Sequence, residues 1–291
     1  MPELHEKIVH TLPFFILNDN DITMARQCLS SLVGNGRPSH LVTYNQGELS
    51  NELVAEFLDA FEMPYTIIGE GSNVGIPIAR QRCFEHVWQH MPHVEYVSEI
   101  HLDMIFTPNW AEDIAQRLAN TDEPMLSPAI LTALGELHPE HRGKAIVQVP
   151  DDVEQLLELL PTFRRDELME GFVHPVIHKN SILKTVGGYD TRFLTGMQGY
   201  EDDSLLLGYR HFMGGQTQWR PKADLNTWVF HATMKQRFQL NNIEAEMEKN
   251  GNGLIHQYGI YGLMELADIH QNPEFQAMAE SVIAQMYRKV G

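Results

Sequence analysis

Short apolar runs alternate with longer amphipathic segments through the first hundred residues of the chain. The apolar runs have the length and bulk of buried strands, and they lie at residues 12–19, 40–45, 65–69 and 94–106. Between them, apolar residues recur at helical spacing at residues 22–33, 49–61 and 73–91. This order favours an α/β fold with a mainly parallel sheet that is covered by helices on both faces.

The alternation becomes less regular after residue 125. A strand is predicted at residues 125–134, and helices are predicted at residues 151–160 and 200–215. Residues 174–190 indicate a strand, a short helix and a Gly-Gly turn, and helical spacing returns from residue 238 onward. We therefore expect one α/β domain over residues 1–235 and a helical C-terminal extension over residues 236–291.

The composition is that of an ordinary globular protein, with 43% hydrophobic and 21% charged residues. Asp and Glu number 39 against 21 Lys and Arg, which gives a formal net charge of −18. Such a charge repels a phosphate backbone, so the sequence argues against nucleic acid as a partner. No segment has about 18 uninterrupted apolar residues, and we therefore expect a cytoplasmic protein without an integral membrane segment.

The two cysteines, Cys28 and Cys83, both lie in segments of helical spacing. A disulfide framework is therefore not indicated, and a thiol-rich metal site is excluded. Any metal ion would have to be bound by His, Asp or Glu side chains.

Polar side chains interrupt the apolar pattern where the predicted strands end. Asn18 begins a polar cluster after the first strand, Asn45 ends the second, and His101 and Asp103 lie in the stretch EIHLDMIFTPNW. Ligands of parallel α/β sheets bind at the carboxyl ends of the strands, so these residues are candidates for a binding site. Taken alone, His101 and Asp103 are equally well explained as a polar pair that hydrogen-bonds loop backbone.

Six motifs along the chain resemble, in order, the successive signatures of family-2 glycosyltransferases of the GT-A fold. They are Asn20 with CLSSL eight residues later, NVGIPIAR, HLDMIFTPNW, VGGYDTRF, GYEDDSLLLGYR and WVFHA. Each motif alone is weak, but together they span residues 12–232. The resemblance implies a Rossmann-like GT-A domain, with a nucleotide-sugar part at about residues 1–110 and an acceptor part at about residues 111–235.

In that family, an Asp-x-Asp signature binds a divalent cation and, through it, the diphosphate of the donor. The resemblance places Asp103 on the second aspartate and His101 on the first, so the motif here is His-x-Asp. Imidazole is a good ligand for Mn²⁺ and a poorer one for Mg²⁺, and it also hydrogen-bonds ribose or phosphate without a metal. His231 matches a late family histidine, although a buried core histidine is the alternative. The implied cofactor is Mn²⁺ or Mg²⁺, with Asp103, His101 and His231 as ligands.

The segment GYEDDSLLLGYR matches the family's Glu-Asp pair at the start of a helix. In inverting members, this acid removes the proton of the acceptor hydroxyl, which attacks the anomeric carbon from the face opposite the diphosphate. The resemblance makes Asp202 the expected base beside Glu201, and we expect the two carboxylates to raise each other's pKa. The alternative is that Glu201, Asp202 and Asp203 only complement the helix N-terminus.

The nucleotide contacts that the resemblance implies are spread over several loops. Asn45 stands where the family has an aspartate that reads the base. An amide both donates and accepts, so this change disfavours uridine and leaves thymidine and guanosine nucleotides open. Arg80 would approach the diphosphate, unless it lies on an exposed helix face. The expected nucleotide-sugar-binding residues are Asn18, Asn20, Asn45, Asn73, Arg80, His101 and Gly188.

These features predict an inverting, metal-dependent glycosyltransferase that moves a sugar from a nucleotide diphosphate-sugar to a hydroxyl acceptor in glycan or polysaccharide biosynthesis. The acceptor would be a glycan or a small molecule, and the C-terminal helices would cover the acceptor side or form a homodimer contact. A non-catalytic nucleotide-sugar-binding or scaffold protein is an alternative. It is favoured because His101 and Asn45 stand where the family has aspartates. A sugar-nucleotide pyrophosphorylase is a weaker one, because it needs a Gly-rich, basic signature near the first strand, where this chain has acidic and amide residues.

Overall fold

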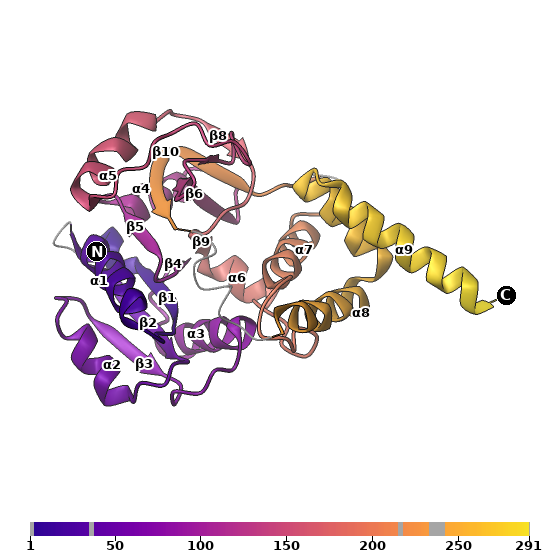
Figure 1. Ribbon diagram of the computed structural model, residues 1–291, viewed down its shortest axis with the longest axis horizontal. Coiled ribbons are helices and arrows are strands. Elements are labelled where there is room, and N and C mark those ends of the chain that lie inside the picture. Colours follow the sequence, from indigo (N-terminus) through magenta and orange to yellow (C-terminus); the bar gives the residue numbers. More distant parts are fainter. Residues whose placement is uncertain (1–2, 35–37, 215–217, 233–241, 291) are drawn as a thin grey trace.

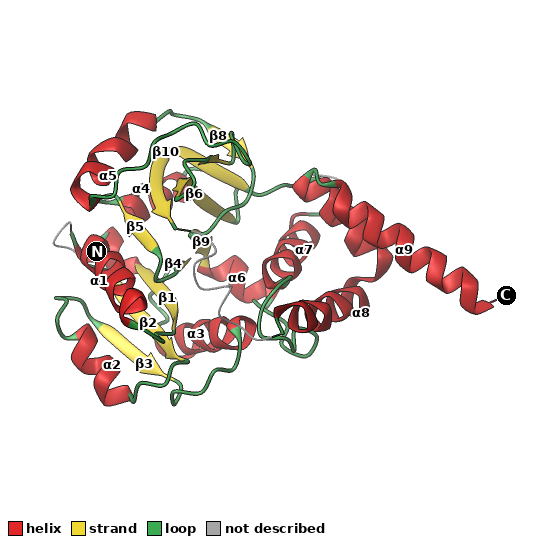
Figure 2. Ribbon diagram, in the orientation of Figure 1, coloured by secondary structure: helices red, strands yellow, loops and turns green. Residues whose placement is uncertain are grey.

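The computed structural model describes residues 3–34, 38–214, 218–232 and 242–290. Its described strands form one ten-stranded sheet with helices packed around it (Figure 1, Figure 2). The strands are β1 (Ile8–Phe14), β2 (His40–Asn45), β3 (Tyr65–Ile68), β4 (Tyr96–Glu99), β5 (Met104–Phe106), β6 (Met125–Thr132), β7 (Leu137–His138), β8 (Leu168–Glu170), β9 (Val176–Lys179) and β10 (Lys222–His231). The α-helices are α1 (Asp19–Val33), α2 (Asn51–Leu58), α3 (Ile76–His90), α4 (Trp110–Ala119), α5 (Val153–Leu159), α6 (Asn180–Val186), α7 (Glu201–Met213), α8 (Ile243–His270) and α9 (Pro273–Val290). Short 3-10 helices lie at Leu4–Lys7 and Leu160–Phe163.

The strands follow the order β3-β2-β1-β4-β9-β6-β10-β5, with β7 beside β6 and β8 beside β10. Strands β3, β2, β1 and β4 are parallel to one another, and β10 is parallel to β6. β9 runs antiparallel to both of its neighbours, β4 and β6. The predicted fold class, a mixed and mainly parallel α/β sheet flanked by helices, is confirmed, because the longest pairings (β1–β2 and β6–β10) are parallel.

Two hydrophobic clusters cover the two faces of the parallel strands. Alternate residues of a strand point to opposite faces, so Leu12 and Val9 of β1 enter different clusters. The Leu12 cluster includes side chains of α1, α2 and α4, and the Val9 cluster includes side chains of α3, α6, α7 and α8. The helices are thus held to the sheet from both sides by apolar burial.

The first strand begins and ends earlier than the apolar run predicts. The chain leaves the sheet after Phe14 and reaches Asn18, which caps α1. Its side-chain oxygen accepts hydrogen bonds from the backbone nitrogens of Asn20 (3.0 Å) and Asp21 (3.2 Å). α1 therefore starts at Asp19, three residues before the predicted start.

The fourth apolar run does not form one strand. Its first part is β4, which pairs with β1, and its second part is β5, which pairs antiparallel with β10. One straight strand does not reach both partners, because β1 and β10 are separated by β4, β9 and β6 in the sheet. His101 and Asp103 therefore lie in the loop between β4 and β5, and the prediction of a single strand is wrong.

The C-terminal helices α8 and α9 lie at the end of the molecule away from α1 and α2 (Figure 1). Leu254, Leu263 and Leu266 of α8 belong to the same hydrophobic cluster as side chains of α3 and α7. The predicted boundary at residue 235 falls outside the described residues and stays a prediction. Among the residues that the structure describes, no helix has the length and apolar content needed to cross a membrane.

Candidate active site

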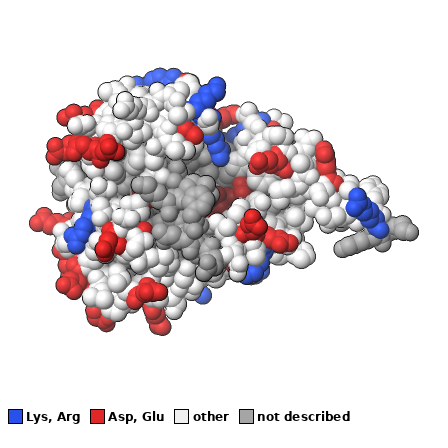
Figure 3. Space-filling view, viewed as in Figure 1, with Lys and Arg blue, Asp and Glu red and all other residues white. Residues whose placement is uncertain are grey.

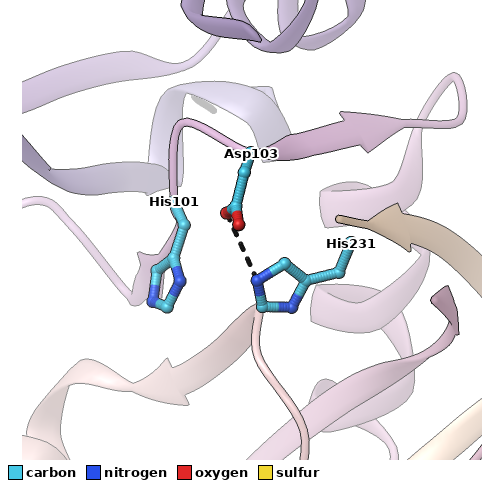
Figure 4. Close-up of side chains that lie close together, drawn as sticks. All are labelled: His101, Asp103 and His231. Carbon is cyan, nitrogen blue, oxygen red and sulfur yellow. Dashed lines mark ion pairs between the residues drawn. The ribbon is translucent and has the colours of Figure 1, made fainter. Parts of the chain in front are cut away.

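The β4–β5 loop and the end of β10 bring the three predicted metal ligands together (Figure 4). His231 is the last residue of β10 and pairs with Met104, the residue after Asp103, in the antiparallel ladder. One ligand atom from each of His101, Asp103 and His231 lies within 4.8 Å of the others, and Nε2 of His231 is 3.3 Å from Oδ1 of Asp103. In the described part of the chain, no other group of three His, Cys, Asp or Glu side chains is arranged to hold a metal ion.

A buried arginine contacts the first histidine of this group. Arg80 of α3 is only 1% exposed, and its guanidinium donates hydrogen bonds to Nε2 of His101 and Oε2 of Glu99. A guanidinium has donors only, so Nε2 of His101 is the acceptor and the proton of the neutral ring lies on Nδ1. Arg80 is therefore not on an exposed helix face, and it fixes the tautomer of His101.

Glu99 joins Arg80 to a buried chain of hydrogen bonds. The carboxylate accepts from Arg80 and from the hydroxyl of Tyr189 (2.8 Å), and its Oε1 is 2.8 Å from Nε2 of His178. Nδ1 of His178 is in turn 2.8 Å from the hydroxyl of Tyr209. Burial alone would raise the pKa of Glu99, but the charge of Arg80 and the hydrogen bond from His178 hold that pKa far below its usual range. Glu99 is thus an ionised carboxylate that keeps Arg80 in place.

The predicted base, Asp202, is connected to the metal-ligand group through His174. Oδ1 of Asp202 is 3.0 Å from Nε2 of His174, and the rings of His174 and His101 stack with their centroids 4.9 Å apart. His174 is 9% exposed, and its Nδ1 has no hydrogen-bond partner within the described residues. The sequence analysis missed His174, because it is one of 15 histidines and lies in a stretch without a motif.

The pKa of Asp202 is lowered rather than raised. Burial raises it, but the charge and hydrogen bond of His174 and the charge of Arg80 outweigh the effect of burial. The expectation that Glu201 and Asp202 raise each other's pKa is therefore wrong for Asp202, where cationic neighbours dominate. Glu201 itself is buried at the start of α7.

Asn45, which was expected to contact the base, hydrogen-bonds to residues of its own loop. Its Nδ2 donates to the carbonyl of Leu49 and to Oδ1 of Asn51, both at 2.8 Å, and its Oδ1 accepts from the backbone nitrogen of Gly47 at 3.2 Å. Both N–H groups are thus used, and only an acceptor lone pair is left for a base. The nucleotide role of Asn45 stays a prediction, and its side-chain geometry counts against it.

The other predicted nucleotide-binding residues lie at loop and helix ends. Asn18 caps α1, Asn20 lies exposed in its first turn, and Oδ1 of Asn73 accepts from the backbone nitrogen of Gly75 at 3.1 Å. Gly188 has a positive φ of 70° and contacts α3 so closely that a Cβ would lie 2.4 Å from the side-chain oxygen of Gln81. Their nucleotide contacts stay predictions.

Two surface hollows of about 550 and 450 Å³ have none of the predicted site residues in their linings. One is lined by residues around α1 and α2, including Arg26 and Phe61, and the other lies beside α3, with Tyr44 and His86 in its lining. Neither is lined by Asp103. The candidate site therefore rests on the chemistry of its side chains rather than on the size of a hollow.

The side chains around Asp103 fit a divalent cation. Asp103 offers a carboxylate oxygen and His231 an imidazole nitrogen, a mixed donor pair that suits Mn²⁺ better than Mg²⁺. A third ligand from His101 requires a free nitrogen lone pair, and that lone pair accepts from Arg80 in this structure. Asp103 and His231 are thus the ligand pair that the geometry leaves available.

The fold resembles that of S. aureus TarS. Residues 1–349 of TarS in complex with UDP-GlcNAc match with a TM-score of 0.55 and 10% sequence identity, over 90% of this chain and 71% of that chain. The complex of the same TarS residues with UDP matches with a TM-score of 0.54 and 11% identity, over 93% of this chain and 72% of that chain. No family model matches the sequence, and no curated protein matches it. At these identities, the likeness shows a shared fold alone.

Proposed function

We propose that this protein is a glycosyltransferase that moves a sugar from a nucleotide diphosphate-sugar to a hydroxyl acceptor, with inversion and with the help of Mn²⁺ or Mg²⁺. The observation that carries the proposal is the convergence of Asp103, His231 and Asp202, from three separate segments, around the stacked rings of His101 and His174. The fold shared with a protein that binds UDP-GlcNAc supports it.

The donor diphosphate would lie beside Asp103 and His231. Arg80 is paired with Glu99, so the charge that this guanidinium would offer to a diphosphate is largely cancelled. This balance favours a bound cation, which would be held by Asp103 and His231 and would supply positive charge to the leaving group. His101, held by Arg80, would form the wall of the site between this pair and His174.

The acceptor hydroxyl would lie against Asp202. The carboxylate takes the hydroxyl proton while the acceptor oxygen bonds to the anomeric carbon, and the bond from that carbon to the diphosphate breaks with its electron pair leaving on the nucleoside diphosphate. Attack from the face opposite the leaving group inverts the configuration. His174 holds Oδ1 of Asp202, and the low pKa of Asp202 keeps the carboxylate ionised at neutral pH.

UDP-sugars are the first donors to test. The structural neighbour binds UDP and UDP-GlcNAc, whereas the sequence argument for thymidine or guanosine rests on Asn45, whose N–H groups are used in its loop. A non-catalytic nucleotide-sugar-binding protein is the second candidate. It is favoured because position 101 has a histidine that accepts a hydrogen bond from Arg80, where an acidic metal ligand was expected.

The binding half of the proposal is tested by thermal unfolding with UDP, GDP and dTDP, each with and without Mn²⁺. We expect at least one nucleotide to raise the Tm only when Mn²⁺ is present, because the cation joins the diphosphate to Asp103 and His231. Asp103→Asn should abolish this shift. Absence of a Mn²⁺-dependent shift with all three nucleotides would contradict the transferase proposal.

The catalytic half is tested with Asp202→Asn in an assay that follows release of UDP from UDP-GlcNAc, or of GDP and dTDP from their sugars. We expect kcat to fall by about 10²–10⁴-fold, the range typical for loss of a general base, while the Kd for the nucleotide stays unchanged. Asp151→Asn, at an exposed position before α5, is the matched control. Full activity of Asp202→Asn would reject this base, and nucleotide binding without any release by the unmodified protein would favour the binding-protein alternative.

A further inference from the structure

The loop that precedes the proposed base is held by helix α8. Residues 196–200 lead directly into α7, whose second residue is Asp202. Asn250 of α8 is fully buried and bonds this loop at both ends, since its Oδ1 accepts from the backbone nitrogen of Gly196 (2.6 Å) and its Nδ2 donates to the carbonyl of Gly199 (2.8 Å). A buried amide is costly unless its donor and acceptor are both satisfied, and this loop satisfies both.

Glycines allow the helix and the loop to meet backbone to backbone. A Cβ on Gly196 would lie 2.2 Å from the carbonyl oxygen of Glu246, and a Cβ on Gly253 would lie 2.0 Å from the carbonyl oxygen of Phe193. Neither position accepts a side chain unless one backbone moves against the other. The sequence NGNG at residues 250–253 therefore lets the backbone of α8 pack directly against the backbone of the loop.

The same loop contacts the helix that carries Arg80. The backbone nitrogen of Ile76, the first residue of α3, donates to the carbonyl of Met197 at 2.7 Å, and Oε2 of Glu246 accepts from the backbone nitrogen of Met197 at 2.9 Å. The backbone of Met197 is thus held by α3 on one side and by α8 on the other. The loop links α8 to both α3, with Arg80, and α7, with Asp202.

We propose that α8 is a positioning element of the active site and that Asn250 is its central positioning residue. This inference rests on the proposed glycosyltransferase function. Asn250 touches no reacting atom, but it fixes where the chain enters α7, and so it sets where Asp202 stands relative to a sugar beside Asp103. The main contacts of α8 are with α7 and α9, while Asp103 and His231 belong to other elements, so α8 affects the chemical step more than nucleotide binding.

The test compares Asn250→Asp with Asn252→Asp in the full chain. The first substitution removes the donor to the carbonyl of Gly199, and the second makes the same chemical change at an exposed position of the same helix. For Asn250→Asp we expect kcat for release of UDP from UDP-GlcNAc to fall by about 10²-fold, the effect of misplacing a reacting group by about 1 Å. The KM for UDP-GlcNAc and the Kd for UDP should stay within about twofold, because Asn250 bonds neither Asp103 nor His231 and takes no part in the bond between Met197 and α3. Asn252→Asp should match the unmodified protein in all three.

A second variant covers the case in which Asn250→Asp unfolds below the assay temperature. Glu246→Ala removes the bond to Met197 together with the ion pair to the exposed Lys249, and we expect a fall in kcat of about tenfold with KM unchanged. The proposal is overturned if a folded Asn250→Asp variant keeps its kcat, or if kcat and nucleotide affinity are lost together. Absence of nucleotide binding and release in the unmodified protein would instead reject the proposed function.

Discussion

Arg80 contacts His101 at the position where the resemblance to family-2 glycosyltransferases places a first aspartate. An aspartate at position 101 would place two carboxylates, its own and that of Glu99, beside the guanidinium of Arg80. Histidine accepts the hydrogen bond from Arg80 without adding negative charge, so Arg80 and Glu99 remain a balanced pair. This charge balance gives a physical reason for the His-x-Asp motif.

Glu99→Gln is expected to destabilise the protein by about 3–5 kcal/mol, because it leaves the buried charge of Arg80 without its counterion. The free energy of unfolding is measured by urea denaturation at neutral pH. Glu95→Gln is the control: Glu95 pairs with Lys7 at 2.8 Å, but its side chain is 52% exposed, and a change within about 1 kcal/mol is expected there. Equal effects of the two substitutions would show that Arg80 does not depend on Glu99.

Asp103, His231 and Asp202 were expected at the site because their motifs resemble those of a known family, and their roles stay predictions. The structure places them around the rings of His101 and His174. His174 was missed, because its importance comes only from neighbours that are distant in the sequence. Charge effects were also beyond the sequence, since the lowered pKa of Asp202 depends on side chains that only the folded chain brings close.

At the scale of elements, apolar spacing predicted the alternating strands and helices of the first half, together with β9 and α6. It failed where a strand pairs with a distant partner: the 94–106 run divides into β4 and β5 because the two halves join β1 and β10, respectively. The short strands β7 and β8 were also missed, since segments of two and three residues have no measurable period.

Helix α8 bends at Gly259, whose φ of 67° and ψ of −167° belong to a region that is essentially restricted to glycine. A Cβ there would meet no atom within 4 Å, so the cost of Gly259→Ala comes from the backbone alone. We expect this substitution to lower the free energy of unfolding by about 1–3 kcal/mol, measured by urea denaturation. Gly34→Ala, at a helical φ of −62°, should be neutral or stabilising by up to about 1 kcal/mol, and a similar loss there would contradict the backbone argument.

At the scale of the whole molecule, the surface has an excess of negative charge, whereas the buried charges of Arg80 and Glu99 are paired. The face shown in Figure 3 carries more acidic than basic side chains, in keeping with the net charge of −18. This excess of negative charge repels a free nucleotide diphosphate at long range, and dissolved salt screens the repulsion. Inside the protein, by contrast, Arg80 and Glu99 form an ion pair, and burial keeps His10 neutral.

His10 predicts how the stability of the whole protein responds to acid. Its ring is 3% exposed, stacks on Trp110 and lies 3.0 Å from the hydroxyl of Ser98, and burial lowers its pKa from 6.5 to about 3. Between these two values the unfolded chain binds a proton that the folded chain does not, so stability rises with pH. This contribution is complete above about pH 6.5 and falls by about 1.4 kcal/mol per pH unit below it, until pH approaches 3.

His10→Asn removes this titration, although it also lowers stability at pH 7.5 by disturbing the contacts with Trp110 and Ser98. The quantity to measure is therefore the difference in free energy of unfolding between the two proteins, by urea denaturation from pH 7.5 to pH 5.0. We expect this difference to be constant above about pH 6.5 and to shrink by about 2 kcal/mol at pH 5.0, because only the unmodified protein binds a proton on unfolding there. His211→Asn, at an exposed position of α7, should give a constant difference throughout. A constant difference for His10→Asn as well would mean that the His10 ring accepts a proton inside the fold.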